Sequence, residues 1–175
     1  PDSRTRDPRA CELSLVSGMG SVGIPFKHLV SIVQIVGDND DQALEVIARG
    51  GYAVKDRPAV LRRLAYARKW LANYAPDDMK FSTQSVLPDE AKALPADVKT
   101  ALGWFADHLA ADMAADAVHA LFYEAKEQTG VGTAELFRGF YLSLIARERG
   151  PRAGWFAVTL GTEFVRKRLK ETAAS

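Results

Sequence analysis

The chain has 175 residues, of which 47% are hydrophobic and 26% are charged, as in an ordinary globular domain. Its formal net charge of +1 gives no overall attraction to a polyanion, so a polyanionic partner would have to be met by a local patch. One cysteine, Cys11, excludes an internal disulfide framework and predicts a reducing, cytoplasmic compartment, and no run of about 18 apolar residues predicts a membrane span.

The first 23 residues carry no helical pattern. Residues 1–10 are polar and begin without methionine, so we interpret 1–23 as a linker or as sequence added for expression, ahead of a domain over 24–175 that is part of a longer protein. A strand-like run at 11–17 precedes glycines 18, 20 and 23, which match the G-x-G-x-x-G pattern of dinucleotide sites. Such a site needs a parallel sheet, and no strand pattern follows residue 24, so we reject it.

From Pro25 onward the apolar residues recur at helical spacing, which predicts an all-α bundle or cage of about six to eight helices. The first three helices are expected over residues 25–37, 40–51 and 58–76. Asp40 or Asp41 is the expected N-cap of the second of them.

The second half of the chain follows a long connector. Residues 76–94 lack periodicity and predict an irregular segment with one turn of helix, after which helical patterns resume at Pro95. A break is expected near 114–116, and Thr133 and Thr162 are the expected N-caps of the last two long helices. A short helix is expected just before Thr162.

Between those two long helices lies the stretch RERGPRAGWF, residues 147–156. Gly150 is expected to take the left-handed C-cap position of the preceding helix, and Pro151 to fix the direction in which the chain leaves it. Arg147, Arg149 and Arg152 surround this corner and are free to approach a base or a phosphate.

Two clusters of basic residues suggest nucleic-acid binding. Arg57, Arg62, Arg63, Arg68 and Lys69 have no acidic residue between them and are followed by two aromatic residues. Residues 147–170 hold seven cations, Arg166 and Lys167 among them, against two carboxylates. Guanidinium groups bind phosphates and aromatic rings stack on unpaired bases. The alternative is that both clusters are solvated helix faces, and that the terminal basic helix complements its own dipole.

No catalytic or metal-binding pattern is present in the sequence. His28, His108 and His119 fall on different predicted helices, none has a partner at metal-ligand spacing, and each is expected to be a solvated helix residue. We therefore expect no metal site, no cofactor and no catalysis by this chain alone.

Residues 136–142 together with 145–156, IARERGPRAGWF, resemble the C-terminal end of class I lysyl-tRNA synthetases. Weaker similarity extends upstream through 120–124, ALFYE, and Ile24-Pro25-Phe26, so that the resemblance covers roughly 24–170. The HIGH-like and KMSKS-like motifs that bind ATP in that family are absent. The resemblance thus implies the helical anticodon-binding domain without the Rossmann catalytic domain.

What the resemblance implies about function follows from the family. The expected partners are the anticodon stem-loop of tRNA(Lys) and the catalytic domain of the same longer chain, and ATP would be bound by that catalytic domain. Neither DNA nor a membrane is expected as a partner. In related glutamyl-tRNA synthetases a similar proline-containing corner lies against the anticodon. The anticodon contacts implied here are Arg147, Arg149, Gly150, Pro151, Arg152 and Trp155. Secondary candidates for the tRNA backbone are Arg62, Arg63, Arg68, Lys69, Arg166 and Lys167.

Two alternatives stay open from the sequence. One is a helical protein-interaction module without a nucleic-acid role, and the other is the anticodon domain of a glutamyl-type synthetase. For Trp155 the alternative to a base contact is packing against Phe164 in the terminal helical hairpin.

Overall fold

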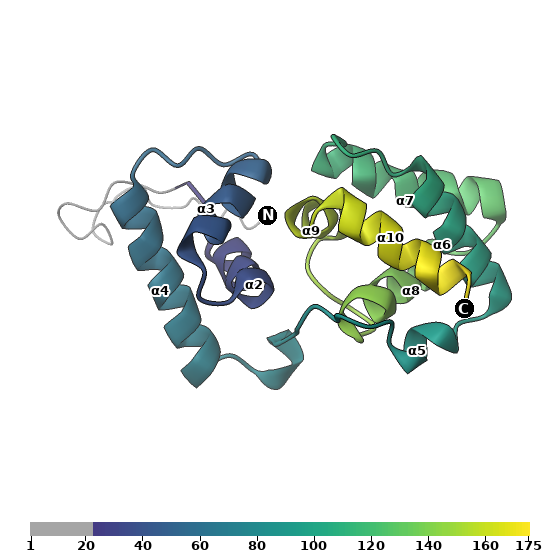
Figure 1. Ribbon diagram of the computed structural model, residues 1–175, viewed down its shortest axis with the longest axis horizontal. Coiled ribbons are helices and arrows are strands. Elements are labelled where there is room, and N and C mark those ends of the chain that lie inside the picture. The colour runs from purple at the N-terminus through teal and green to yellow at the C-terminus, as the bar shows by residue number, and fades with distance from the viewer. Residues whose placement is uncertain (1–22) are drawn as a thin grey trace, which may run out of the picture.

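The computed structural model describes residues 23–175, and within this range it contains helices and no strand, which confirms the all-α prediction. The strand-like run at 11–17 and the glycines at 18 and 20 lie outside the described residues. This described part of the chain holds nine α-helices and one short 3₁₀ helix, η1 (Figure 1). In chain order they are α2 (Phe26–Val36), α3 (Asp40–Arg49), α4 (Arg57–Asn73), η1 (Asp77–Met79), α5 (Asp89–Lys92), α6 (Ala96–His108), α7 (Ala115–Thr129), α8 (Thr133–Ile145), α9 (Ala153–Leu160) and α10 (Thr162–Ala173).

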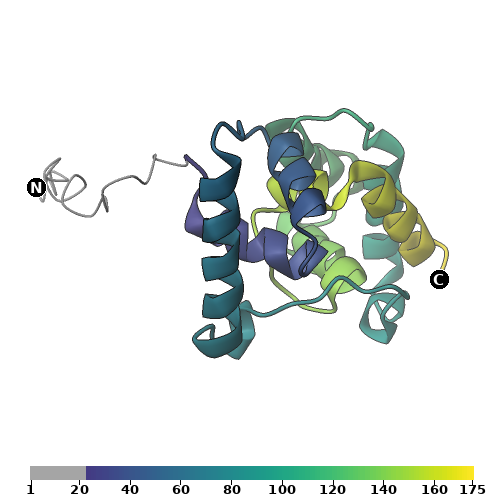
Figure 2. The ribbon, with the colours of Figure 1, turned by 60° about the vertical axis from the view of Figure 1, so that its left-hand side comes forward.

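The helices form two lobes, each around its own apolar core. Helices α2, α3 and α4 make the first lobe, whose core includes Leu29, Ile32, Ile47 and Leu64. Helices α5 to α10 make the larger second lobe around a cluster of phenylalanines. Figure 1 shows α9 at the junction, and Figure 2 shows α4 along the outer side of the first lobe.

The predicted N-caps of three helices are wrong. The N-cap of α3 is Asn39 and not Asp40 or Asp41, because the side chain of Asn39 accepts a hydrogen bond from the backbone N–H of Gln42 and both aspartates lie in the first turn. Thr133 and Thr162 are the first helical residues of α8 and α10 and do not cap them. Thr162 instead donates its hydroxyl to the carbonyl of Ala111, which ties α10 to the loop after α6.

The connector after α4 is irregular, as predicted, and two polar side chains, the half-buried Gln34 and the buried Arg168, hold it. Gln34 of α2 accepts from the N–H of Phe81 at 2.7 Å and donates to the carbonyl of Met79 at 3.3 Å. Arg168 of α10 donates to the carbonyls of Gln84, Ser85 and Val86. These bonds satisfy backbone groups that no helix satisfies, so the connector has a fixed path between the lobes.

Helix α9 joins the two lobes. Most of its side chains pack in the core of the second lobe, but Trp155 inserts into the core of the first and is only 6% exposed. Gly154 permits the close crossing of α9 over α7, because a Cβ there would lie 1.9 Å from the carbonyl oxygen of Ala115.

Candidate nucleic-acid interface

The proline corner forms one wall of a groove at the junction of the lobes. The groove has a volume of about 370 Å³, which falls at the lower end of the range of about 300–1,000 Å³ for small-ligand sites. Helix α2 supplies the opposite wall and the η1 connector closes a third side. Lining residues are Lys27, His28, Val30, Ser31, Gln34, Asp78, Met79, Lys80, Phe81, Arg147, Arg149, Gly150, Pro151 and Arg152.

The path of the corner differs from the one expected. Helix α8 ends at Ile145, and its left-handed C-cap is Ala146 with φ 52°, so the prediction that Gly150 is the C-cap is wrong. Gly150 is required for a different reason. A Cβ there would lie 2.6 Å from the ring of Tyr141, whose hydroxyl donates to the carbonyl of Pro151. The buried tyrosine thus holds the corner against α8, and its burial raises its pKa.

Cations dominate the groove. Lys27, Lys80, Arg147, Arg149 and Arg152 face one carboxylate, Asp78. A groove lined in this way concentrates positive potential and attracts an anion.

The three arginines of the corner differ in how they are held. Arg147 donates to the backbone carbonyl of Asp77 at 3.2 Å, and Arg152 pairs with Asp116 at 2.9 Å. Arg149 is exposed and makes no hydrogen bond or ion pair with any residue of 23–175. Its guanidinium therefore has its full hydrogen-bonding capacity available for a ligand.

Trp155 lies behind the groove and not in it. Its indole stacks on the imidazole of His28, with 4.3 Å between ring centroids, and its side chain belongs to the core of the first lobe. The expectation that it packs against Phe164 is wrong, because α9 presents this face to α2. With its faces covered, the indole is not presented to a base.

His28 is half-buried, so the expectation of a solvated histidine is wrong at this position. Its Nδ1 lies 2.6 Å from the hydroxyl of Tyr52. Burial, and then the positive charges of Lys27 and Arg152, hold the pKa of His28 below its usual 6.5. A neutral imidazole packs on the indole without the cost of burying a charge.

The basic residues of α4 divide into two groups. Arg68 points inward, with side-chain atoms 2.8 Å from Asp40 and 3.1 Å from the carbonyl of Gly37, so it ties α4 to the turn between α2 and α3. Arg57 pairs with Asp41 at 2.7 Å. Arg62 and Lys69 are exposed, and Arg63 is half-buried.

The basic residues of α10 belong to the second lobe, and none of them lines the corner groove. Arg166 lies 4.0 Å from Glu163, and Lys167 is exposed. Arg168 is a structural residue and 4% exposed, so it cannot meet a ligand. The structure therefore brings together the corner residues and leaves the α4 and α10 groups on other surfaces.

Sequence reasoning missed the rest of the groove. Two of its cations, Lys27 and Lys80, are 53 positions apart in the sequence, and neither belongs to a cluster of basic residues. Only the packing of α2 and the connector against the corner brings them together.

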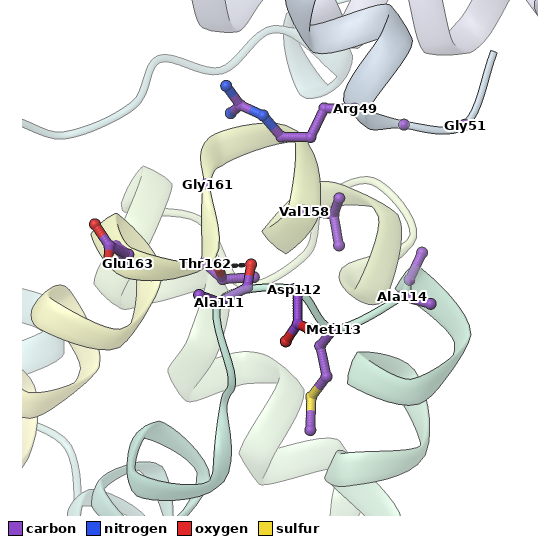
Figure 3. Close-up of a pocket in the computed structure, with 12 residues that line it drawn as sticks. Arg49, Gly51, Ala111, Asp112, Met113, Ala114, Val158, Gly161, Thr162 and Glu163 are labelled. Atoms are coloured by element: carbon purple, nitrogen blue, oxygen red, sulfur yellow. Dashed lines mark hydrogen bonds between the residues drawn. The ribbon is translucent and has the colours of Figure 1, made fainter. Parts of the chain in front are cut away.

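A second hollow, of about 640 Å³, lies between the end of α3 and the start of α10 (Figure 3). Small residues and backbone line much of it, and Arg49, Asp112 and Glu163 are its charged residues. No cluster of three or more metal-ligating side chains exists within residues 23–175. None of the helices in that same range is long and apolar enough to cross a membrane.

Comparison with known proteins assigns the family. The family model described as "Anticodon binding domain" matches residues 28–173. This chain belongs to the anticodon-binding-domain family. It is 39% identical over 165 residues to a lysine–tRNA ligase of Archaeoglobus fulgidus, a match that covers 93% of this chain and 33% of that protein.

Two further relatives carry the same name. A lysine–tRNA ligase of Methanosarcina barkeri is 29% identical over 191 residues, covering 99% of this chain and 36% of that protein. One of Picrophilus torridus is 34% identical over 154 residues, covering 86% of this chain and 29% of that protein. The chain spans about a third of the length of the curated relatives it matches. This anticodon-binding-domain chain is thus similar to one segment of lysine–tRNA ligases, as the resemblance at residues 136–156 implied.

Proposed function

We propose that this chain recognises the anticodon of tRNA(Lys) as part of a longer lysine–tRNA ligase, and that the corner groove holds a nucleotide of the anticodon loop. The observation that carries the proposal is the convergence of five cations on a groove at the sequence motif that is similar to these ligases. The ATP-dependent aminoacylation would then be carried out by other parts of the longer protein.

Phosphate binding is assigned to the arginines. Arg149 forms no ion pair with a carboxylate of residues 23–175, so its planar guanidinium can take a phosphate through two parallel hydrogen bonds. Arg147 and Arg152, held by the carbonyl of Asp77 and the carboxylate of Asp116, line the same wall with less freedom. Lys27 and Lys80 add positive charge on the other sides of the groove.

We assign base recognition to the apolar side chains of the groove and to Asp78. Met79 and Phe81 offer an apolar surface for the flat face of a base, and the carboxylate of Asp78 accepts hydrogen bonds from a base N–H group. Trp155 is not among the proposed contacts; it supports the wall that His28 lines. The names of the relatives favour lysine over the glutamyl alternative, and the family match favours RNA over a protein partner.

The test is equilibrium binding of the whole chain to tRNAs that differ in the anticodon. The proposal predicts tighter binding to tRNA with the lysine anticodon than to the same tRNA with a glutamate anticodon, and a steep loss of affinity as salt is raised. Equal affinity for both tRNAs would contradict it. Preference for the glutamate anticodon would assign the domain to the glutamyl type.

A further inference from the structure

We propose that the outward face of α4 is a second RNA-binding surface that contacts the phosphate backbone without regard to sequence. The inference rests on the proposed function in taking tRNA as the natural partner. It concerns a different surface, on the outer side of the first lobe (Figures 1 and 2).

The charge of α4 is the first observation. The helix has no acidic residue between Arg57 and Asn73. Two cations of α4 are already paired. Arg57 forms an ion pair with α3, and Arg68 forms ion pairs with α3 and with the turn before α3. Arg62 and Lys69 are exposed, and their side chains form no ion pair or hydrogen bond with a residue of 23–175. The helix therefore presents net positive charge outward.

The spacing of these residues is the second observation. Arg62, Tyr66, Lys69 and Asn73 recur at intervals of four, three and four, which places them on one face of the helix. Arg62 and Lys69 are two turns apart, roughly 10 Å along the axis. Tyr66 lies between them and is 55% exposed, so its ring is accessible to a base.

The combination fits an RNA strand. Cations spaced along a helix contact successive phosphates, and an exposed aromatic ring stacks on any base, since every base has a flat face. A protein partner would need a complementary acidic surface and would gain little from a single ring between two flexible cations.

A contact between α2 and α4 links this surface to the corner groove. The ring of Phe26, which precedes the groove residue Lys27, packs edge-on against Trp70 of α4 with 6.0 Å between centroids. Trp70 follows Lys69 in the sequence. A strand that leaves the groove past Lys27 therefore reaches the face of α4 by crossing Phe26, which is itself partly exposed.

The test compares two charge-matched double variants of the whole chain. One variant carries Arg62→Gln with Lys69→Gln, and the control carries Lys92→Gln with Lys126→Gln, two exposed lysines of the second lobe. The probes are tRNA with the lysine anticodon, the same tRNA with a changed anticodon, and a single-stranded oligouridylate. The affinity of each is measured as a function of salt.

The inference predicts that the α4 variant loses about 1.4–1.8 from the slope of log affinity against log salt, as two lost phosphate contacts require. The ratio between the two tRNAs stays the same, and the control keeps the slope of the parent. Tyr66→Ala should weaken oligouridylate binding about 5- to 150-fold, which corresponds to about 1–3 kcal/mol, and leave the slope unchanged.

The outcomes separate this inference from the proposed function. An unchanged slope in the α4 variant, or an equal loss in the control, would overturn the inference and assign the face to a partner other than RNA. A slope loss in a chain without any anticodon preference would support the inference and overturn the proposed function. Absence of RNA binding by the parent chain would overturn both.

Discussion

His28 of α2 stacks on Trp155 of α9 with 18° between the ring planes, and this contact joins the two lobes behind the corner groove. His28 lines the groove on one side and meets the hydroxyl of Tyr52 on another. The position of one groove wall therefore depends on an indole inserted from the opposite lobe. A substitution at His28 or Trp155 can therefore change both RNA binding and the stability of the fold, so both must be measured.

Replacement of Trp155 by alanine should destabilise the fold. The indole is buried in the first lobe, so its loss leaves a cavity and should cost about 3–5 kcal/mol of unfolding free energy. Trp104→Ala, which removes a half-exposed ring, is the matched control and should cost less. Urea unfolding measures both. An unchanged midpoint for Trp155→Ala together with weaker RNA binding would show that the ring contacts RNA after all.

The low pKa of His28 predicts a pH dependence of stability. In the unfolded chain this histidine takes up a proton near pH 6.5, but in the folded protein it does so only at lower pH. The stabilisation from its neutral form is therefore complete above 6.5 and is lost as the pH falls through the folded pKa. The melting temperature of the parent should fall more than that of His28→Phe between about pH 7 and about pH 5. Parallel curves would contradict this assignment.

Gly154→Ala tests the crossing of α9 over α7. The added methyl group would overlap the carbonyl oxygen of Ala115, and neither helix backbone can shift without disturbing the core. We expect a loss of at least about 1–3 kcal/mol, the usual cost of overpacking. Gly132→Ala is the control, since a Cβ there meets nothing within 4 Å. Equal melting temperatures for the two variants would show that the crossing is looser than described.

Arg168 should behave as a core residue in spite of its basic neighbours. Arg168→Met removes the donor from the connector carbonyls of Gln84, Ser85 and Val86. A hydrogen bond from a charged donor is worth about 1.5–3 kcal/mol, so the loss of these bonds should make the variant unfold at lower denaturant concentration. Arg166→Met, on the exposed side of the same helix, should change stability little. If the two variants unfold together, the connector is held by other contacts.

The comparison of sequence and structure shows which features were predictable. Helical spacing from Pro25 onward predicted the fold class, because each helix buries one apolar face whatever its partner is. The cap at Asn39 was missed because four consecutive residues, 38–41, are all good N-caps, and only the geometry of the turn decides between them.

The groove was predictable only in part. The corner residues are adjacent in sequence, so the motif at 147–152 located one wall. The other walls come from α2 and from the connector, which long-range packing brings there. The position of Trp155 depends in the same way on how α9 meets α2. Short-range patterns carry no information on such contacts.

The central claim is that the corner groove contacts the anticodon loop, and Arg149 tests it most directly because this exposed side chain has no ion pair or hydrogen bond within residues 23–175. The measurement is the affinity of the whole chain and of Arg149→Gln for a stem-loop RNA with the lysine anticodon. Lys126→Gln, at an exposed position on α7, serves as the charge-matched control. We predict that Arg149→Gln loses about 1–3 kcal/mol of binding if the contact is to a base, or about one unit of salt slope if it is to a phosphate, with an unchanged melting temperature. Binding equal to that of the parent in both affinity and salt slope would contradict the account.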